Sequence, residues 1–298
     1  MPGSFDETRW EALVDSISAG QCTPFLGAGV STPTLPSGGQ LAGVLASEFR
    51  YPLVDVSNLS RVGQYLATTR DPLFPKRRVA KWIVKQEGQP PDFLDPRDPH
   101  GVLASLNLPI YLTTNWDSFM AMALRARRRE VTQEVSRWNE DVVHEAGAFD
   151  AISPSPECPL VYHLHGHAGM PSSMVLTEDD YIDFVAKLAR DLEAVVPPTI
   201  QEALSFHSLL FVGYSLTDWN FHVLLRLLMS SLATRKPQHL HVSVQIPNRD
   251  LIAKESEDDA KQFIAGYLET SNVRVHWGEA GPFLYELRDR CRRADAGG

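Results

Sequence analysis

The segment CTPFLGAGVS, residues 22–31, joins a short apolar run to a turn that contains two glycines. The five residues from Cys22 to Leu26 have the length and composition of a buried strand. Gly27 and Gly29 follow at once, and a residue without Cβ lets the backbone turn sharply and approach another group closely. If a helix follows, its free N–H groups and positive dipole end face the turn, which predicts a phosphate-binding loop. The alternative is a tight strand-to-helix turn that binds nothing.

Apolar runs of the same kind recur along the chain and alternate with helical patterns. The further runs are PIYLTT (109–114), PLVYHLH (159–165), SLLFVGY (208–214), HLHVSVQ (239–245) and VRVHW (273–277). Amphipathic patterns lie at 5–18, 116–127, 217–232, 255–268 and 282–293. Thr177, followed three residues later by Asp180, predicts one more helix start through a capping box. The alternation predicts a Rossmann-like, mostly parallel α/β sheet with helices on both faces.

Two stretches interrupt this alternation. Residues 38–106 contain several helical patterns, separated by prolines and polar segments, and no apolar strand. We interpret them as a helical module inserted between the first and second strands. Residues 136–158 are polar and end in SPSPECP, which predicts a surface loop. We expect residues 1–298 to form a single domain.

Composition and charge exclude several classes of protein. Hydrophobic residues make up 43% of the chain and charged residues 22%, as in a globular protein with a substantial core. The net charge of −9 argues against direct binding of nucleic acid. No apolar run approaches the ~20 residues needed to span a bilayer, and the start, MPGSFDETRW, lacks the layout of a signal peptide. Cys22, Cys158 and Cys291 are scattered, which suits the reducing cytoplasm and excludes a four-cysteine zinc ribbon.

The TTNWD segment places polar residues directly beyond the carboxyl end of the second apolar run. Thr114, Asn115 and Asp117 follow PIYLT, and ligands of open α/β sheets bind at this edge. The alternative is that Asn115 caps the helix that begins near Trp116 and that Asp117 favours the same helix dipole.

Three histidines lie at a spacing of two in PLVYHLHGHAG, residues 159–169. On an extended strand His163, His165 and His167 face one side. Together with HLH at 239–241 they form a candidate metal site. Gly166, however, is expected to end the strand, and the alternative is that His163 and His167 are ordinary polar residues at a strand end.

A second glycine turn follows the run SLLFV in SLLFVGYSLTDWNF, residues 208–221. Gly213 lets the backbone approach a ribose or phosphate, and Ser215 supplies a hydroxyl and an N–H group. A helix capped near Thr217 or Asp218 is expected next. Taken alone, this segment is also consistent with a simple strand-to-helix turn.

The four segments in this order resemble the sirtuin family, in its divergent prokaryotic branch associated with antiviral defence. The resemblance spans about residues 20 to 232. It implies that Gly27, Ala28, Gly29 and Ser31 of GAGVS hold the diphosphate of NAD. It also implies that Gly213 and Ser215 line the adenosine side of the same cleft.

The resemblance assigns the chemistry to the two middle segments. Asn115 would lie by the nicotinamide ribose and position the attacking water, with Thr114 beside it in the binding set. Asp117 would bond the nicotinamide carboxamide. His165, in HLHG, would act as general base near the ribose hydroxyls, a role that suits a histidine with a pKa near 6.5 at cytoplasmic pH.

Departures from the family pattern favour NAD cleavage over deacylation. The four-cysteine zinc ribbon of sirtuin deacylases is absent, and TPTLPSGGQLAG after GAGVS lacks their Pro-Asp-Phe-Arg run. The helical module at 38–106 is expected to occupy part of the face where an acyl-lysine peptide enters. A dehydrogenase is disfavoured because the third glycine of its fingerprint and the acidic ribose-binding residue are missing.

These observations predict an NAD glycohydrolase that releases nicotinamide and ADP-ribose, with NAD as substrate and no metal. The alternatives are a module that binds NAD or ADP-ribose without turnover, an NAD-dependent deacylase, and a metal-dependent hydrolase built on HLHGH and HLH. NAD depletion must be restrained, so the resemblance implies activation by homo-oligomerisation or by a separate partner that carries the sensor, such as an ATPase or a nucleic-acid-guided protein. We expect a cytoplasmic protein with no direct nucleic-acid or membrane binding.

Overall fold

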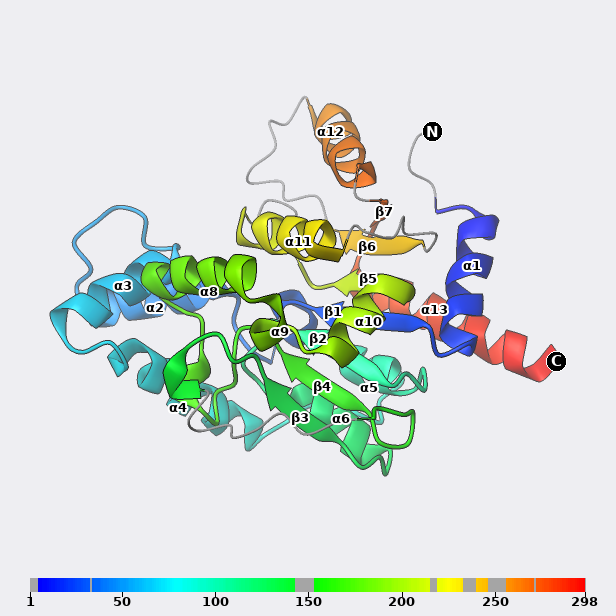
Figure 1. The fold of residues 1–298 in the computed structure, drawn as a ribbon, viewed down its shortest axis with the longest axis horizontal. Coiled ribbons are helices and arrows are strands. Elements are labelled where there is room, and N and C mark those ends of the chain that lie inside the picture. Colours follow the sequence, from blue (N-terminus) through cyan, green and yellow to red (C-terminus); the bar gives the residue numbers. More distant parts are fainter. Residues whose placement is uncertain are drawn as a thin grey trace.

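The computed structural model describes residues 5–32, 34–142, 153–214, 219–232, 240–245, 256–270 and 272–297. Within them, seven parallel strands form one sheet in the order β3-β4-β2-β1-β5-β6-β7 (Figure 1). The strands are β1 (Cys22–Leu26), β2 (Ile110–Thr113), β3 (Thr132–Val135), β4 (Leu160–His163), β5 (Ser208–Val212), β6 (His241–Gln245) and β7 (Val273–Trp277). The Rossmann-like α/β architecture predicted from the sequence is therefore confirmed.

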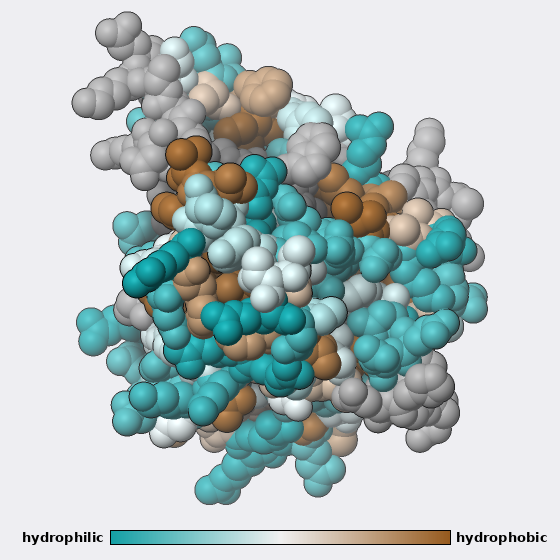
Figure 2. Space-filling view, turned by 90° about the vertical axis from the view of Figure 1, so that its left-hand side faces the viewer, coloured by the Kyte–Doolittle hydropathy of each residue, from teal (hydrophilic) through white to brown (hydrophobic). Residues whose placement is uncertain are grey.

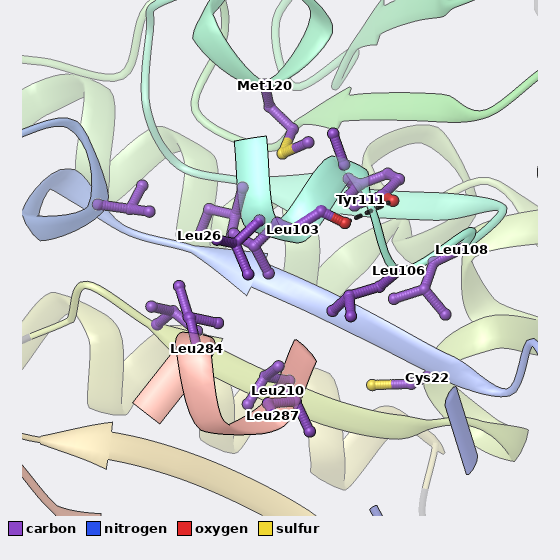
Figure 3. Close-up of a cluster of buried hydrophobic side chains, with 14 of the residues drawn as sticks. Cys22, Leu26, Leu103, Leu106, Leu108, Tyr111, Met120, Leu210, Leu284 and Leu287 are labelled. Carbon is purple, nitrogen blue, oxygen red and sulfur yellow. Dashed lines mark hydrogen bonds between the residues drawn. The ribbon is translucent and has the colours of Figure 1, made fainter. Parts of the chain in front are cut away.

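Helices cover both faces of the sheet. One layer contains α1 (Glu7–Ser18), α5 (Pro99–Ala104), α6 (Phe119–Ala126) and α13 (Ala280–Gly297). The other contains α8 (Glu178–Arg190), α9 (Leu192–Val195), α10 (Pro198–Phe206), α11 (Trp219–Leu232) and α12 (Glu257–Glu269). Figure 3 shows part of the hydrophobic core between the first of these layers and the sheet, where leucines of β1, α5 and α13 belong to one buried cluster. In it, Tyr111 donates a hydrogen bond to the carbonyl oxygen of Leu103 at 3.2 Å. None of the helices described is both long and apolar enough to cross a membrane.

Strand order indicates where a ligand is expected to bind. From β1 the chain passes to β2, β3 and β4 on one side, and it then returns across β1 to β5 on the other. Register pairs Leu26 with both Thr113 and Val212, so the carboxyl ends of β1, β2 and β5 stand at one level. Ligands of open α/β sheets bind at such a topological switch point.

Strand β3 has no counterpart among the predicted strands. Its sequence, TQEV, is polar, and its first three residues are only half-buried because it forms an edge of the sheet. A half-exposed edge strand carries no apolar run, so periodicity does not reveal it. The capping box predicted at Thr177 is confirmed, since its Oγ1 accepts from Asp180 N–H at 3.1 Å and Asp180 Oδ2 accepts from Thr177 N–H at 2.8 Å.

Residues 38–106 form four helices and no strand, as their sequence predicts. α2 (Gly38–Glu48), α3 (Leu59–Thr69) and α4 (Phe74–Glu87) enclose a small core of their own, whereas α5 packs into the main core. Figure 2 views the molecule from the side of these helices, where hydrophilic side chains predominate and hydrophobic ones lie scattered between them.

A buried ion pair connects this helical module to α8. Lys76 of α4 is 5% exposed, and its Nζ lies 2.7 Å from Asp180 Oδ1 and 5.3 Å from the centre of the Trp138 ring. Asp180 Oδ2 accepts hydrogen bonds from the N–H groups of Leu176 and Thr177. Lys76 and Asp180 therefore connect α4 to α8, and the Lys76 ammonium group also lies over the ring of Trp138 in the segment after β3.

Replacing Lys76 with methionine is expected to lower the free energy of unfolding by about 3 kcal/mol, because the Asp180 charge stays buried without its counter-ion. The value lies at the low end of the range for broken buried pairs because two backbone N–H groups still solvate the carboxylate. Urea unfolding measures the change. Lys81→Met, an exposed lysine of the same helix, is the matched control with an expected change within about 0.5 kcal/mol. Equal stability of the two variants would contradict the prediction.

Candidate active site

The two glycine turns pack against each other, backbone to backbone. Gly27 N–H donates to Val212 O at 2.9 Å, and Gly29 N–H donates to Gly213 O at 2.8 Å. A Cβ on Gly27 would lie 2.7 Å from Gly213 O, and Gly213 itself has a φ of +81°. Glycine is therefore required at these positions so that the two turns can pack against each other.

The turn after β1 continues as a single 3₁₀ turn, Ala28–Ser31, rather than as the helix that the phosphate-loop interpretation assumes. A full helix dipole is thus absent at this turn. Ala28 and Gly29 are exposed, and Ala28 N–H donates to no group within the described part of the chain. Individual N–H groups of this turn, rather than a helix terminus, are what the site offers to an anion.

Asn115 reaches from the end of β2 to the turn at 27–31. Its Nδ2 donates to Gly27 O at 3.1 Å and to Ser31 Oγ at 3.3 Å. Because Gly27 O can only accept, the amide must point its nitrogen at this oxygen, which fixes the orientation of the side chain. Asn115 Oδ1 has no hydrogen-bond donor among the residues described, and the half-buried side chain leaves it available to orient a water.

Asp117 is a buried carboxylate beside the same turn. It is 5% exposed, with Oδ2 accepting from Ser31 Oγ at 3.1 Å and Oδ1 accepting from Phe119 N–H at 3.0 Å. Burial raises the pKa of Asp117 from 3.8 to about 6, the two hydrogen bonds oppose this, and the negative charge of Glu87 adds to the rise. Asp117 therefore changes protonation within the physiological range.

The side chain of Tyr214 lies at the carboxyl end of β1, next to the end of β2. Its OH donates to Leu26 O at 2.9 Å and lies 2.9 Å from Thr114 Oγ1, so it joins the ends of β1 and β2. Its ring packs beside Phe25. Thr114 thus lies where the ends of β1 and β2 meet.

His165 does not share partners with Asn115. The indole of Trp116 donates to His165 O at 3.0 Å, which places the two segments side by side. The imidazole of His165, however, packs edge-on against Phe184 and Tyr181 of α8, with ring centres 5.0 and 5.5 Å apart. Burial lowers the pKa of His165 from 6.5 to about 3. The expectation of a base that titrates near 6.5 is therefore wrong: the ring is neutral throughout the physiological range.

The other two histidines of the motif make different contacts, so the three do not face one side. The rings of His163 and His167 are 4.7 Å apart, His163 Nδ1 lies 3.0 Å from Asn115 O, and His167 Nε2 lies 2.8 Å from Ser118 Oγ. Burial lowers the pKa of both rings. Among the described residues, no three His, Cys, Asp or Glu side chains are grouped so that they could hold a metal ion; His239 of the HLH segment lies outside these residues.

The structure thus gathers most of the predicted binding residues at the carboxyl ends of β1, β2 and β5. Those brought together are Gly27, Ala28, Gly29, Ser31, Thr114, Asn115, Asp117 and Gly213. Ser215, with Thr217 and Asp218, lies outside the described residues. Glu87 of α4 was not predicted; its Oε1 accepts from Ser118 N–H at 2.6 Å. Nothing in the polar segment QEGQPPD (86–92), which contains Glu87, indicates this contact, because the contact depends on how the helical module packs against the start of α6.

An open parallel sheet with glycine turns and polar groups at its switch point defines a doubly wound α/β protein of the dinucleotide-binding type. Residues 109–276 match the SIR2-like domain, and the chain belongs to that family. The resemblance to sirtuins found in the sequence is confirmed.

The chain is similar to three proteins named NAD(+) hydrolase ThsA. It is 20% identical over 292 residues to that of Acinetobacter baumannii (strain 532279), which covers 95% of this chain and 56% of the relative. It is 26% identical over 170 residues to that of Enterococcus faecium, covering 57% and 33%. It is 27% identical over 146 residues to that of Bacillus cereus (strain MSX-D12), covering 49% and 28%. The matched region spans about half of the first relative and about a third of the other two.

Proposed function

We propose that this protein hydrolyses NAD to nicotinamide and ADP-ribose. The observation that carries the proposal is the bond from Asn115 Nδ2 to Gly27 O, which joins the expected water-positioning residue to the expected diphosphate turn. The relatives named NAD(+) hydrolase support the same reaction.

The reaction needs few groups because nicotinamide leaves as a neutral pyridine. The bond between the ribose C1′ and the nicotinamide nitrogen breaks, and its electron pair leaves with nicotinamide. The oxygen of a water molecule then bonds to C1′, and the water loses one proton. Asn115 Oδ1 accepts a hydrogen bond from this water and so fixes its direction of approach. Such positioning contributes up to about 7–11 kcal/mol to lowering a barrier.

His165 acts in this scheme as a neutral imidazole. Since the pKa of His165 is about 3, the ring is always in its proton-accepting form but is a weak base. It accepts a hydrogen bond from a ribose hydroxyl or from the water, and the released proton passes to solvent. Asp117 accepts the N–H of the nicotinamide carboxamide through its carboxylate.

We further propose that the protein is the NAD-depleting effector of an antiviral defence system. Activation by homo-oligomerisation or by a partner with a sensor, an ATPase or a nucleic-acid-guided protein, would restrain the reaction in the absence of infection. The support is the family relationship, together with the cost to a cell of unrestrained NAD cleavage. Deacylation is the alternative reaction, and dependence of nicotinamide release on an acetylated peptide would identify it.

Purified protein at low and high concentration is expected to release nicotinamide and ADP-ribose from NAD in equal amounts. Chromatography of both products measures this, and the double variant Asn115→Ala, His165→Ala serves as the blank. A second candidate, an NAD-binding module without turnover, is favoured by the burial of His165 against α8. Saturable binding of NAD with no product at any protein concentration would establish that module and exclude the hydrolase.

A further inference from the structure

Both main-chain polar groups of Asn115 are held by side chains. Asn115 N–H donates to Thr113 Oγ1 at 2.9 Å, and Asn115 O lies 3.0 Å from His163 Nδ1. The residue stands after the end of β2, where no strand ladder orients it. These two contacts hold the main chain of Asn115, from which its side chain reaches Gly27 O and Ser31 Oγ.

Sheet register explains why the two contacts come from these residues. β2 and β4 are parallel, and Thr113 is paired with His163 in register. Paired residues of adjacent strands point to the same face. The side chains of Thr113 and His163 are thus neighbours on one face of the sheet. Thr113 contacts the N–H group of Asn115, and His163 contacts its carbonyl oxygen.

The partners of His163 determine its tautomer. Asn115 O can only accept, so His163 Nδ1 must carry the proton. His163 Nε2 then has a free lone pair, and the Nε2 amide group of Gln133, 3.4 Å away, can donate to it. His163 is 1% exposed, so water does not replace either partner.

We propose that His163 is a positioning residue that holds the Asn115 main chain, and through it the Asn115 amide, in the geometry needed for catalysis. The proposal rests on the proposed NAD hydrolysis. His163 itself does not reach the reacting atoms. Its contribution is to keep Asn115 Oδ1 directed at the water, because small misplacements of a positioning group are costly in rate.

Two variants separate this role from a merely structural one. In His163→Asn the side-chain amide nitrogen occupies the place of Nδ1 and still donates to Asn115 O. In His163→Gln the amide lies at the place of Nε2, and the donor to Asn115 O is lost. Both variants bury a neutral amide in place of the ring, so their thermal unfolding temperatures are expected to be similar.

Steady-state kinetics with NAD are expected to show about a tenfold lower kcat for His163→Gln with KM within about twofold, whereas His163→Asn stays within about threefold of the wild type. Equal loss in the two variants would overturn the proposal. Imidazole ¹⁵N spectra of the wild type are expected to show the proton on Nδ1 of His163; a proton on Nε2 would also overturn it.

A third measurement keeps the test separate from the proposed function. The ¹³C shift of the Asn115 carbonyl is expected to change in His163→Gln and to be retained in His163→Asn. If the wild type releases no nicotinamide, NAD hydrolysis fails, and this shift together with the tautomer still decides whether His163 holds Asn115. An unchanged shift in both variants contradicts the proposal.

Discussion

Asn115→Ala is expected to lower the rate of nicotinamide release about a thousandfold. Removal of one preorganised polar group from an active site typically costs about 10²–10³ in rate, and Asn115 has two functions. In the proposed mechanism its Oδ1 orients the water, and in the structure its Nδ2 donates to Gly27 O and Ser31 Oγ of the turn at 27–31. Initial rates of nicotinamide release at saturating NAD measure the effect.

Two further variants are to be compared with Asn115→Ala. Gln89→Ala removes an amide from an exposed position and is the matched control, with an unchanged rate. Asn115→Asp keeps the size of the side chain but sets a carboxylate oxygen against Gly27 O, so it is expected to be about as inactive as the alanine variant. A rate for Asn115→Ala within about threefold of the wild type, with the fold intact, would remove Asn115 from the mechanism.

The edge of the sheet at which the candidate site residues lie could be predicted from the sequence, because these residues directly follow apolar strands. In a parallel sheet every carboxyl strand end lies at one edge, so GAGVS, TTNWD and FVGY were expected at that edge once the strands were identified. They are neighbours because β1 lies between β2 and β5, a strand order that no local pattern indicates. The pairing of β1 with β2, in the register that sets Leu26 beside Thr113, then places Asn115 and Asp117 beside the turn at 27–31. Strand β3 was not predicted, because it forms an edge of the sheet and its sequence contains no apolar run.

The orientation of the three histidine side chains could not be predicted, because it depends on the path of the backbone after β4 ends. A spacing of two suggests that His163, His165 and His167 share a face, but the strand stops at His163 and Gly166 has a φ of +80°. The His165 ring therefore packs on α8, and its pKa reflects contacts made with Phe184 and Tyr181 far along the chain. Glu87 likewise comes from the helical module, whose position no local pattern encodes.

Asp117→Asn is expected to stabilise the protein at neutral and alkaline pH. The pKa of Asp117 is raised from 3.8 to about 6 by burial, so between these values the folded protein holds a proton that the unfolded chain has lost. Stability conferred at this site therefore falls as pH rises from about 4 to about 6 and stays low above that. A rise of about two pKa units corresponds to about 3 kcal/mol, which asparagine recovers because it cannot ionise.

The same substitution is expected to slow nicotinamide release about a hundredfold at pH 8, if Asp117 binds the carboxamide N–H as proposed, since a charge-assisted hydrogen bond is then replaced by a weaker neutral one. Wild-type activity should fall as pH drops below about 6, when Asp117 takes up its proton, and the asparagine variant should lack this limb. Unfolding in urea at pH 4 and pH 8 measures the stability: the gain should be present at pH 8 and vanish at pH 4. Asp183→Asn, on the exposed face of α8, is the control with no pH-dependent gain. A variant that is less stable than the wild type at pH 8 would show that the Asp117 carboxylate is a stabilising partner of Ser31 rather than a buried charge retained for binding.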